Sequence, residues 1–100
     1  MVSRVNFLET GPDRIDDVAR VVREVVHPGI SEENGYVGYI VLGNRETGNA
    51  IGVTLWESDE AREISDMKAR QIRPRVEQES GGTMRKVENC EVLFFDVRPQ

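Results

Sequence analysis

Two apolar runs around a short polar loop constrain the fold of this chain more than any other feature of the sequence. Residues 36–42 read YVGYIVL, residues 50–56 read AIGVTLW, and the loop GNRETGN separates them. β-Branched and aromatic residues on both sides of a loop rich in Gly and Asn are typical of a β-hairpin. Gly38 and Gly52 lie inside the two runs, where a glycine often marks a bulge, a bend or the close approach of another group.

Two amphipathic patterns outside the hairpin predict helices. In residues 13–27 apolar side chains recur every three or four positions, and the pattern ends at His27 because a residue followed by proline avoids helical dihedrals. A second helix is expected to begin after the N-cap Ser58 and to kink or end near Pro74, before two glycines close the segment at residues 81–82. Its inner side is thinly apolar and is expected to comprise Ala61, Ile64, Met67, Lys68, Gln71 and Ile72.

Two further extended segments complete a sheet. Residues 3–10 predict the first strand, and residues 90–97, CEVLFFDV, predict a last strand that is apolar on both faces and therefore buried on both. The order β-α-β-β-α-β favours one α+β domain over residues 1–100 with a ferredoxin-like fold, in which two helices cover one face of a four-stranded antiparallel sheet. Since the helices leave the other face open, we expect a homodimer that forms through this open sheet face.

The hairpin register predicts which side chains face the helices. A loop of four residues, 45–48, places Tyr39 opposite Thr54 and Val37 opposite Trp56. The face toward the helices then carries Trp56, Thr54, Gly52, Tyr39, Val37 and Val41, and the open face carries Ile51, Val53, Leu55, Ile40 and Leu42. Trp56 lies beside small residues under a sparsely apolar helix, so it either forms the wall of a pocket or fills the core by packing alone.

Composition excludes several classes of function. The chain has 18 acidic and 13 basic residues, and a net charge of −5 opposes binding to nucleic acid. The basic stretch at residues 68–75 is expected to be a solvated helix face, with an anion-binding pocket edge as the alternative. Cys90 is the only cysteine, so we expect a buried thiol and neither a disulfide within the chain nor a zinc cluster. No signal peptide or membrane span is recognisable, and a cytoplasmic location is expected.

The stretch GYVGYIVLGNRETGNAIGVTLWESDEA, together with the order of elements, resembles the antibiotic biosynthesis monooxygenase family of dimeric α+β barrel proteins. The resemblance implies that Asn6, in the first strand, matches an asparagine that holds substrate or oxygen in several members, and that Trp56 matches a tryptophan of the pocket wall. Haem-degrading members also need a histidine on the second helix, where this chain has Ser65, Asp66 and Met67. The only histidine, His27, is expected to be a solvent-facing residue at the end of the first helix.

The resemblance therefore implies a cofactor-free oxygenase that acts on a phenol or hydroquinone of polycyclic type. Such an enzyme binds a flat ring, excludes water and stabilises an oxyanion, and here Asn6 and Trp56 are the candidate catalytic residues. Tyr39, Thr54, Met67 and Arg70 are expected to line the ligand, with Arg73 as the alternative to Arg70 at the mouth of the pocket. No metal or cofactor is expected. The alternative is a dimeric ligand-binding or interaction module without catalysis, and haem degradation is a distant third function.

Overall fold

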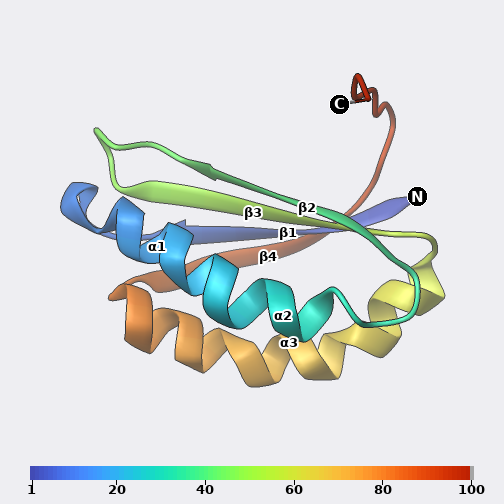
Figure 1. The fold of residues 1–100 in the computed structure, drawn as a ribbon, viewed down its shortest axis with the longest axis horizontal. Coiled ribbons are helices and arrows are strands. Elements are labelled where there is room, and N and C mark those ends of the chain that lie inside the picture. Colours follow the sequence, from blue (N-terminus) through green and yellow to red (C-terminus); the bar gives the residue numbers. More distant parts are fainter. Residues whose placement is uncertain (100) are drawn as a thin grey trace.

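A computed structural model describes residues 1–99 and consists of a sheet with helices on one of its faces (Figure 1). The strands are β1 (Val2–Glu9), β2 (Tyr36–Gly43), β3 (Asn49–Trp56) and β4 (Thr83–Glu91). The helices are η1 (Pro12–Arg14), α1 (Ile15–Val21), η2 (Val22–Val26), α2 (His27–Ile30) and α3 (Asp59–Ser80). The strand order is β2-β3-β1-β4 and the three pairings are antiparallel, so the predicted ferredoxin-like α+β fold is confirmed.

The first helical stretch runs continuously through α1, η2 and α2 and does not end at His27 as the sequence predicts. The backbone N–H of His27 bonds to the carbonyl of Val22, five residues back, which gives η2 its π-helical geometry. Pro28 follows in the first turn of α2, where a missing N–H costs little, and the helix continues to Ile30. The π-helical segment thus allows the chain to pass the proline without ending the helix.

Helix α3 begins where the sequence predicts and is longer than expected. The Ser58 hydroxyl accepts a hydrogen bond from the Ala61 N–H at 3.1 Å, which confirms Ser58 as the N-cap. Pro74 lies inside the helix, which continues past it to Ser80. Gly81 ends α3 with a φ of 74°, a left-handed conformation that glycine adopts without strain.

The last strand differs from the prediction. β4 is the polar segment Thr83–Glu91, and the apolar residues 92–97 lie beyond it, outside the sheet. β4 pairs with β1 alone and is an edge strand, so its charged side chains face solvent and its sequence lacks an apolar signal. Leu93 and Phe94 are 88% and 87% exposed, and Figure 1 shows this C-terminal segment extending away from the sheet.

The hairpin register is partly as predicted. Tyr39 lies opposite Thr54, which confirms that part of the prediction. The predicted pairing of Val37 with Trp56 is wrong, because Tyr36 takes that place and Val37 is the extra residue of a bulge next to Gly38. Tyr39 and Thr54 therefore share the face toward the helices, whereas Val37 is exposed.

The hydrophobic core lies between the helices and the sheet. Its buried members are aliphatic and come from two strands and from both helical stretches: Leu8, Val18, Val21, Val25, Ala50 and Val76. Helix α3 contributes little apolar surface to this core, because Ile64 and Met67 lie on its outer side and buried Ser65 and Ser80 on its inner side. The predicted inner side of α3 is therefore wrong for Ile64 and Met67, whereas Ile72 packs against the core as predicted. Among residues 1–99, no helix combines the length and the apolar character that crossing a membrane requires.

Candidate functional site

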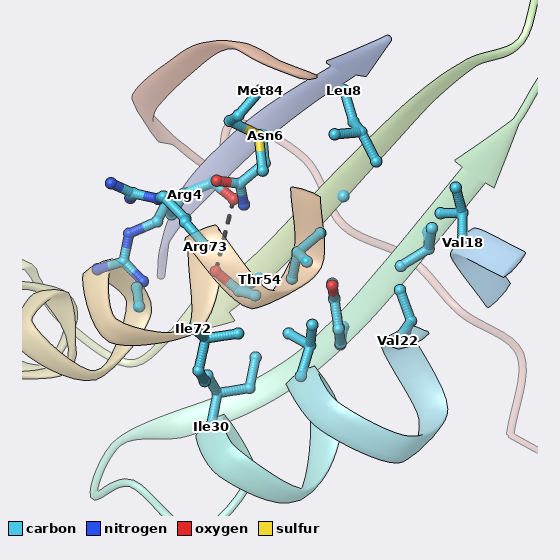
Figure 2. A pocket seen from close by; sticks show the side chains of 16 residues that line it. Arg4, Asn6, Leu8, Val18, Val22, Ile30, Thr54, Ile72, Arg73 and Met84 are labelled. Carbon is cyan, nitrogen blue, oxygen red and sulfur yellow. Dashed lines mark hydrogen bonds between the residues drawn. The ribbon is translucent and has the colours of Figure 1, made fainter. Parts of the chain in front are cut away.

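A cavity of about 70 Å³ separates the sheet from the helices (Figure 2). Most of its wall is aliphatic and includes side chains such as Leu8, Val18, Val22, Val41, Ile72 and Val76. Side chains alternate along a strand, so β1 directs Arg4, Asn6 and Leu8 toward the helices, and β3 directs Gly52 and Thr54 to the same side. The cavity is thus apolar along most of its length and polar where these strand residues meet α3.

The polar end contains two arginines and an amide. Figure 2 shows Arg4, Asn6 and Arg73 together at one end of the cavity, whereas Val18 and Val22 lie at the other. Thr54 lies beside them, and its hydroxyl donates a hydrogen bond of 3.5 Å to the backbone oxygen of Arg4. A ligand in this cavity therefore has hydrogen-bond donors at one end and aliphatic side chains around the rest.

Arg4 is buried, with 3% of its surface exposed, and its guanidinium is held by neighbours. One nitrogen, Nη2, donates to the carbonyl of Arg62 at 2.8 Å and to the hydroxyl of Ser65 at 3.0 Å. The Asp66 carboxylate lies 3.7 Å away. Burial lowers the pKa of Arg4, Asp66 opposes that effect, and the nearby charge of Arg73 lowers the pKa further.

Arg73 is bound more weakly than Arg4. Its buried Nε has no hydrogen-bond partner within residues 1–99, and its Nη2 approaches Asp66 only at 4.0 Å. The Asp66 carboxylate also pairs with Arg70 at 2.7 Å, so one negative charge serves three guanidinium groups. The polar end of the cavity therefore carries uncompensated positive charge.

Tyr39 is a half-buried residue of the cavity wall. Its ring packs over Gly52, where an added Cβ would lie 3.5 Å from the ring and from the hydroxyl oxygen. Burial raises the pKa of Tyr39 to about 12, so the hydroxyl is a donor at neutral pH. Tyr39 also borders a second, outer hollow between the helices and the edge strand β2, which His27 and Tyr36 help to line. Tyr39 therefore contributes to the walls of both the cavity and the outer hollow.

Trp56 is completely buried and does not line the cavity. Its indole N–H donates to the Thr54 hydroxyl at 2.9 Å, and its ring lies 5.8 Å from the Arg4 guanidinium carbon. The Tyr36 ring meets it edge-on at 5.8 Å. Trp56 thus lies behind the polar end and contacts two of the residues that form it.

The structure brings together some of the residues that the sequence singles out and separates others. Asn6, Tyr39 and Thr54 line the cavity. Met67 is 72% exposed on the outer side of α3, and Arg70 borders a neighbouring hollow with Arg4 and Asp66. The prediction that Met67 and Arg70 line the cavity is therefore wrong. Polar and small residues occupy the inner side of α3, so an apolar pattern does not identify that side.

Arg4 escaped the sequence-based prediction, and Arg73 was included in it only as an alternative to Arg70 at the mouth of the pocket. Arg4 lies two positions before Asn6 in β1, so strand alternation alone places both on one face. Arg73 follows Ala69 and precedes Val76 at helical spacing on the inner side of α3. The position of Asn6 thus indicates that Arg4 faces the helices, and the spacing to Val76 indicates that Arg73 lies on the inner side of α3. Both residues are charged, so a search for apolar inner faces does not find them.

Haem does not fit the residues present. The second helix carries Ser65, Asp66 and Met67 where the resemblance to haem-degrading members implies a histidine, and the Ser65 hydroxyl is occupied by the Arg62 carbonyl and by Arg4. His27 borders the outer hollow and not the cavity. Within residues 1–99, no three His, Cys, Asp or Glu side chains are grouped so that they could hold a metal ion.

Comparison with known sequences identifies relatives of the chain. Residues 1–65 match the family model described as antibiotic biosynthesis monooxygenase. The uncharacterized protein Rv2558 of Mycobacterium tuberculosis is 33% identical over 93 residues, which cover 93% of this chain and 39% of that protein. The uncharacterized protein Rv2557 is 31% identical over 81% of this chain and 36% of its own length. The chain thus spans less than two fifths of these curated relatives.

Solved structures share the fold at low sequence identity. A monooxygenase from the gene ActVA-Orf6 of Streptomyces coelicolor, in complex with Nanaomycin D, superposes with a TM-score of 0.72 at 17% identity, covering 99% of this chain and 91% of that one. The haem degrader MhuD of Mycobacterium tuberculosis gives 0.68 at 21% identity, with coverage of 98% and 100%. A dimeric ferredoxin-like protein from an uncultured marine organism gives 0.68 at 13%, with coverage of 97% and 98%.

Proposed function

Because this chain belongs to the antibiotic biosynthesis monooxygenase family, we propose that it is a cofactor-independent monooxygenase acting on a small aromatic metabolite. The observation that carries the proposal is the cavity between sheet and helices, which is apolar along its length and has donors at one end. The proposal treats residues 1–100 as one domain, since α3 and β4, which lie mostly beyond the matched residues, complete the cavity wall.

The proposed reaction needs no redox group from the protein. A phenol reacts with dioxygen to give a quinone and water: one oxygen atom becomes the new carbonyl, the other leaves as water, and the substrate supplies all four electrons. Negative charge develops on oxygen during this reaction, so the protein contributes by excluding water and by donating hydrogen bonds to that oxygen. Asn6 and Tyr39 provide neutral donors within the cavity.

Trp56 has an indirect role in this proposal. It contacts Thr54 by a hydrogen bond and Arg4 through its ring, and both of these residues line the cavity. We therefore assign Trp56 to positioning the polar end, with no contact to substrate. Asn6 is the candidate for direct contact with the reacting oxygen.

Oxygen consumption tests the proposal. Wild-type protein is mixed with a panel of phenols, hydroquinones, naphthols and anthrones, and oxygen uptake is followed with an electrode together with quinone absorbance. For a substrate that reacts, Asn6→Ala is expected to lower the rate by roughly 10²-fold, the effect of losing one donor to a developing oxyanion. The matched control is Asn34→Ala, because Asn34 is exposed in the turn before β2. Uptake no faster than the blank across the panel, or equal rates for both variants, contradicts the proposal.

A second function is a binding module without catalysis. The titratable side chains among the described residues of the cavity wall are Arg4, Arg73 and Tyr39, and none of them is a base at neutral pH. This observation favours the module, since general-base catalysis from the wall is then absent. Tight binding of a panel compound by calorimetry, with no oxygen uptake, would favour this function over the first.

We also propose that the protein forms a homodimer through the open face of the sheet. Ile40 and Leu42 are large apolar residues of the open face that remain exposed, and the C-terminal residues 92–97 add exposed apolar side chains. Burying such surface against a second copy stabilises a small domain. One protein of similar fold is described as dimeric, which supports the proposal.

Sedimentation of a charge variant tests the dimer. Leu42→Glu places a charge on the open face and is expected to shift the protein from dimer to monomer at micromolar concentration. The matched control is Ile64→Glu, since Ile64 is similarly exposed but lies on the outer side of α3. A wild-type monomer, or a variant dimer as stable as the wild type, contradicts the proposed interface.

A further inference from the structure

The positive charge at one end of the cavity is only partly compensated within the described part of the chain. Arg4 is satisfied by the Arg62 carbonyl, by Ser65 and by Asp66, so its guanidinium is fixed. Arg73 lacks such partners: its buried Nε–H makes no hydrogen bond with residues 1–99. An unpaired buried donor on a charged group is costly unless a ligand satisfies it.

Asp66 does not neutralise this end. Its single carboxylate lies 3.7 Å from Arg4, 2.7 Å from Arg70 and 4.0 Å from Arg73, and only the Arg70 distance is that of a hydrogen bond. The remaining attraction is therefore shared between two guanidinium groups that border the cavity. An anionic oxygen at this place would meet two positive charges at the edge of an apolar space, where electrostatic interactions are strong.

We propose that Arg73 is the oxyanion-binding residue of the cavity and that the aromatic substrate binds as its phenolate, with the ionised oxygen at the Arg73 Nε–H and the ring among the aliphatic side chains. This inference rests on the proposed function, because it specifies the substrate of the same site as an ionisable phenol. It also supplies what the cavity wall lacks, since a phenol that binds as its anion needs no general base from the protein.

Two properties of the protein allow local binding of an anion to be distinguished from the effects of net charge and of burial. The net charge of −5 disfavours anion binding in general, so a preference for an anion must come from local charge. Burial by itself raises the pKa of a phenol, and it does so for Tyr39 in the same cavity, to about 12. A bound phenol whose pKa falls must therefore have a cation or several hydrogen-bond donors at its oxygen, and removing the charge of Arg73 separates these two causes.

A coloured phenol tests the inference. 4-Nitrophenol has a single ring, and its anion absorbs visible light whereas the neutral form does not. The nitrophenol is titrated with pH in the absence of protein and in the presence of excess protein. We expect the bound nitrophenol to have a pKa lower by about one unit, which is a tenfold preference for the anion.

Three variants separate Arg73 from its surroundings. Arg73→Gln removes the charge and is expected to abolish the fall in pKa. Arg70→Gln is the matched control, because Arg70 also pairs with Asp66 but is 73% exposed and does not line the cavity. Asp66→Asn removes the competing carboxylate and is expected to lower the pKa of bound nitrophenol further. This third variant keeps the test decisive if thermal unfolding shows that Arg73→Gln is misfolded.

The outcomes are distinct from those of the oxygen-uptake experiment. Absence of nitrophenol binding, a bound pKa that is unchanged or raised, or a fall that survives in Arg73→Gln overturns the inference. An unchanged shift in Asp66→Asn also overturns it. If the pKa falls as expected while no phenol consumes oxygen, the oxyanion site stands and the monooxygenase function fails. If oxygen is consumed while the pKa is unaffected by Arg73, the function stands and this site does not.

Discussion

Replacing Thr54 with valine tests whether the layer behind the cavity is held by a buried hydrogen bond. The Thr54 hydroxyl accepts the Trp56 indole N–H at 2.9 Å, and Trp56 has no exposed surface. Valine keeps the shape of threonine but cannot accept, so the indole N–H loses its partner where water cannot replace it. The expected loss is about 1 to 3 kcal/mol in the free energy of unfolding, the usual cost of a buried unsatisfied donor. In a domain of this size each 1 kcal/mol lowers the Tm by roughly 4 to 8 °C.

A double-mutant cycle with Trp56→Phe isolates this interaction. Unfolding in urea is followed by far-ultraviolet circular dichroism, because the tryptophan itself is changed, at one fixed protein concentration. Phenylalanine has no N–H, so Thr54→Val is expected to cost much less in that background, with a coupling energy of roughly 1 kcal/mol or more. Thr83→Val, at an exposed position of β4, is the matched control and is expected to change stability by less than about 0.5 kcal/mol. Equal losses from Thr54→Val in both backgrounds would refute the reasoning.

Three further predictions concern Tyr39, the hairpin loop and the C-terminal segment. In Tyr36→Phe, Tyr39 is the only tyrosine, and its absorbance should titrate near 12 in the folded protein and near 10 in urea. Since the tyrosine of the unfolded state ionises first, the free energy of unfolding should decline as pH rises from 10 to 12. A midpoint near 10 in the folded protein would contradict this prediction. Gly48→Ala should lower the free energy of unfolding, measured in urea, by more than about 2 kcal/mol. The φ of Gly48 is +81°, and the new Cβ would clash with the Thr10 carbonyl oxygen. A smaller loss of stability would show that the hairpin loop relaxes. Deleting residues 92–100 should weaken self-association in sedimentation while circular dichroism stays native, and undiminished association would remove this segment from the interface.

Much of the fold could be predicted because local and long-range signals agree in the hairpin. Residues of high β-propensity flank a loop with turn residues, and the predicted pairing of Tyr39 with Thr54 follows from the loop length alone. The bulge at Val37 changed only the start of β2, and the neighbouring Gly38 had indicated that a bulge could occur there. The N-cap at Ser58 was predictable for the same reason, since its hydroxyl acts on the residues immediately following it.

The last strand could not be predicted from its own sequence. Residues 92–97 have the apolar character of a buried strand, yet they lie outside the sheet and are largely exposed. The true strand, β4, is charged because it is an edge strand that pairs only with β1. Apolar periodicity reports that a segment becomes buried, and it does not report whether the surface that buries it belongs to the same chain. The exposed apolar segment after β4 supports the proposed homodimer.

The candidate site was the hardest part to predict, and α3 shows the physical reason. A helix that only packs against a sheet presents apolar residues inward, and on that rule Met67 was assigned to the inner side. The observed inner side instead carries Ser65, Ala69, Ile72, Arg73, Val76 and Ser80, so half of it is polar. The Nε–H of Arg73 is buried without a hydrogen-bond partner among residues 1–99, although 25% of the side chain is exposed and Asp66 lies 4.0 Å from its Nη2. Where hydrophobic patterning fails on an inner face, a polar group left without a partner supports the proposed binding site, because the fold alone does not satisfy it.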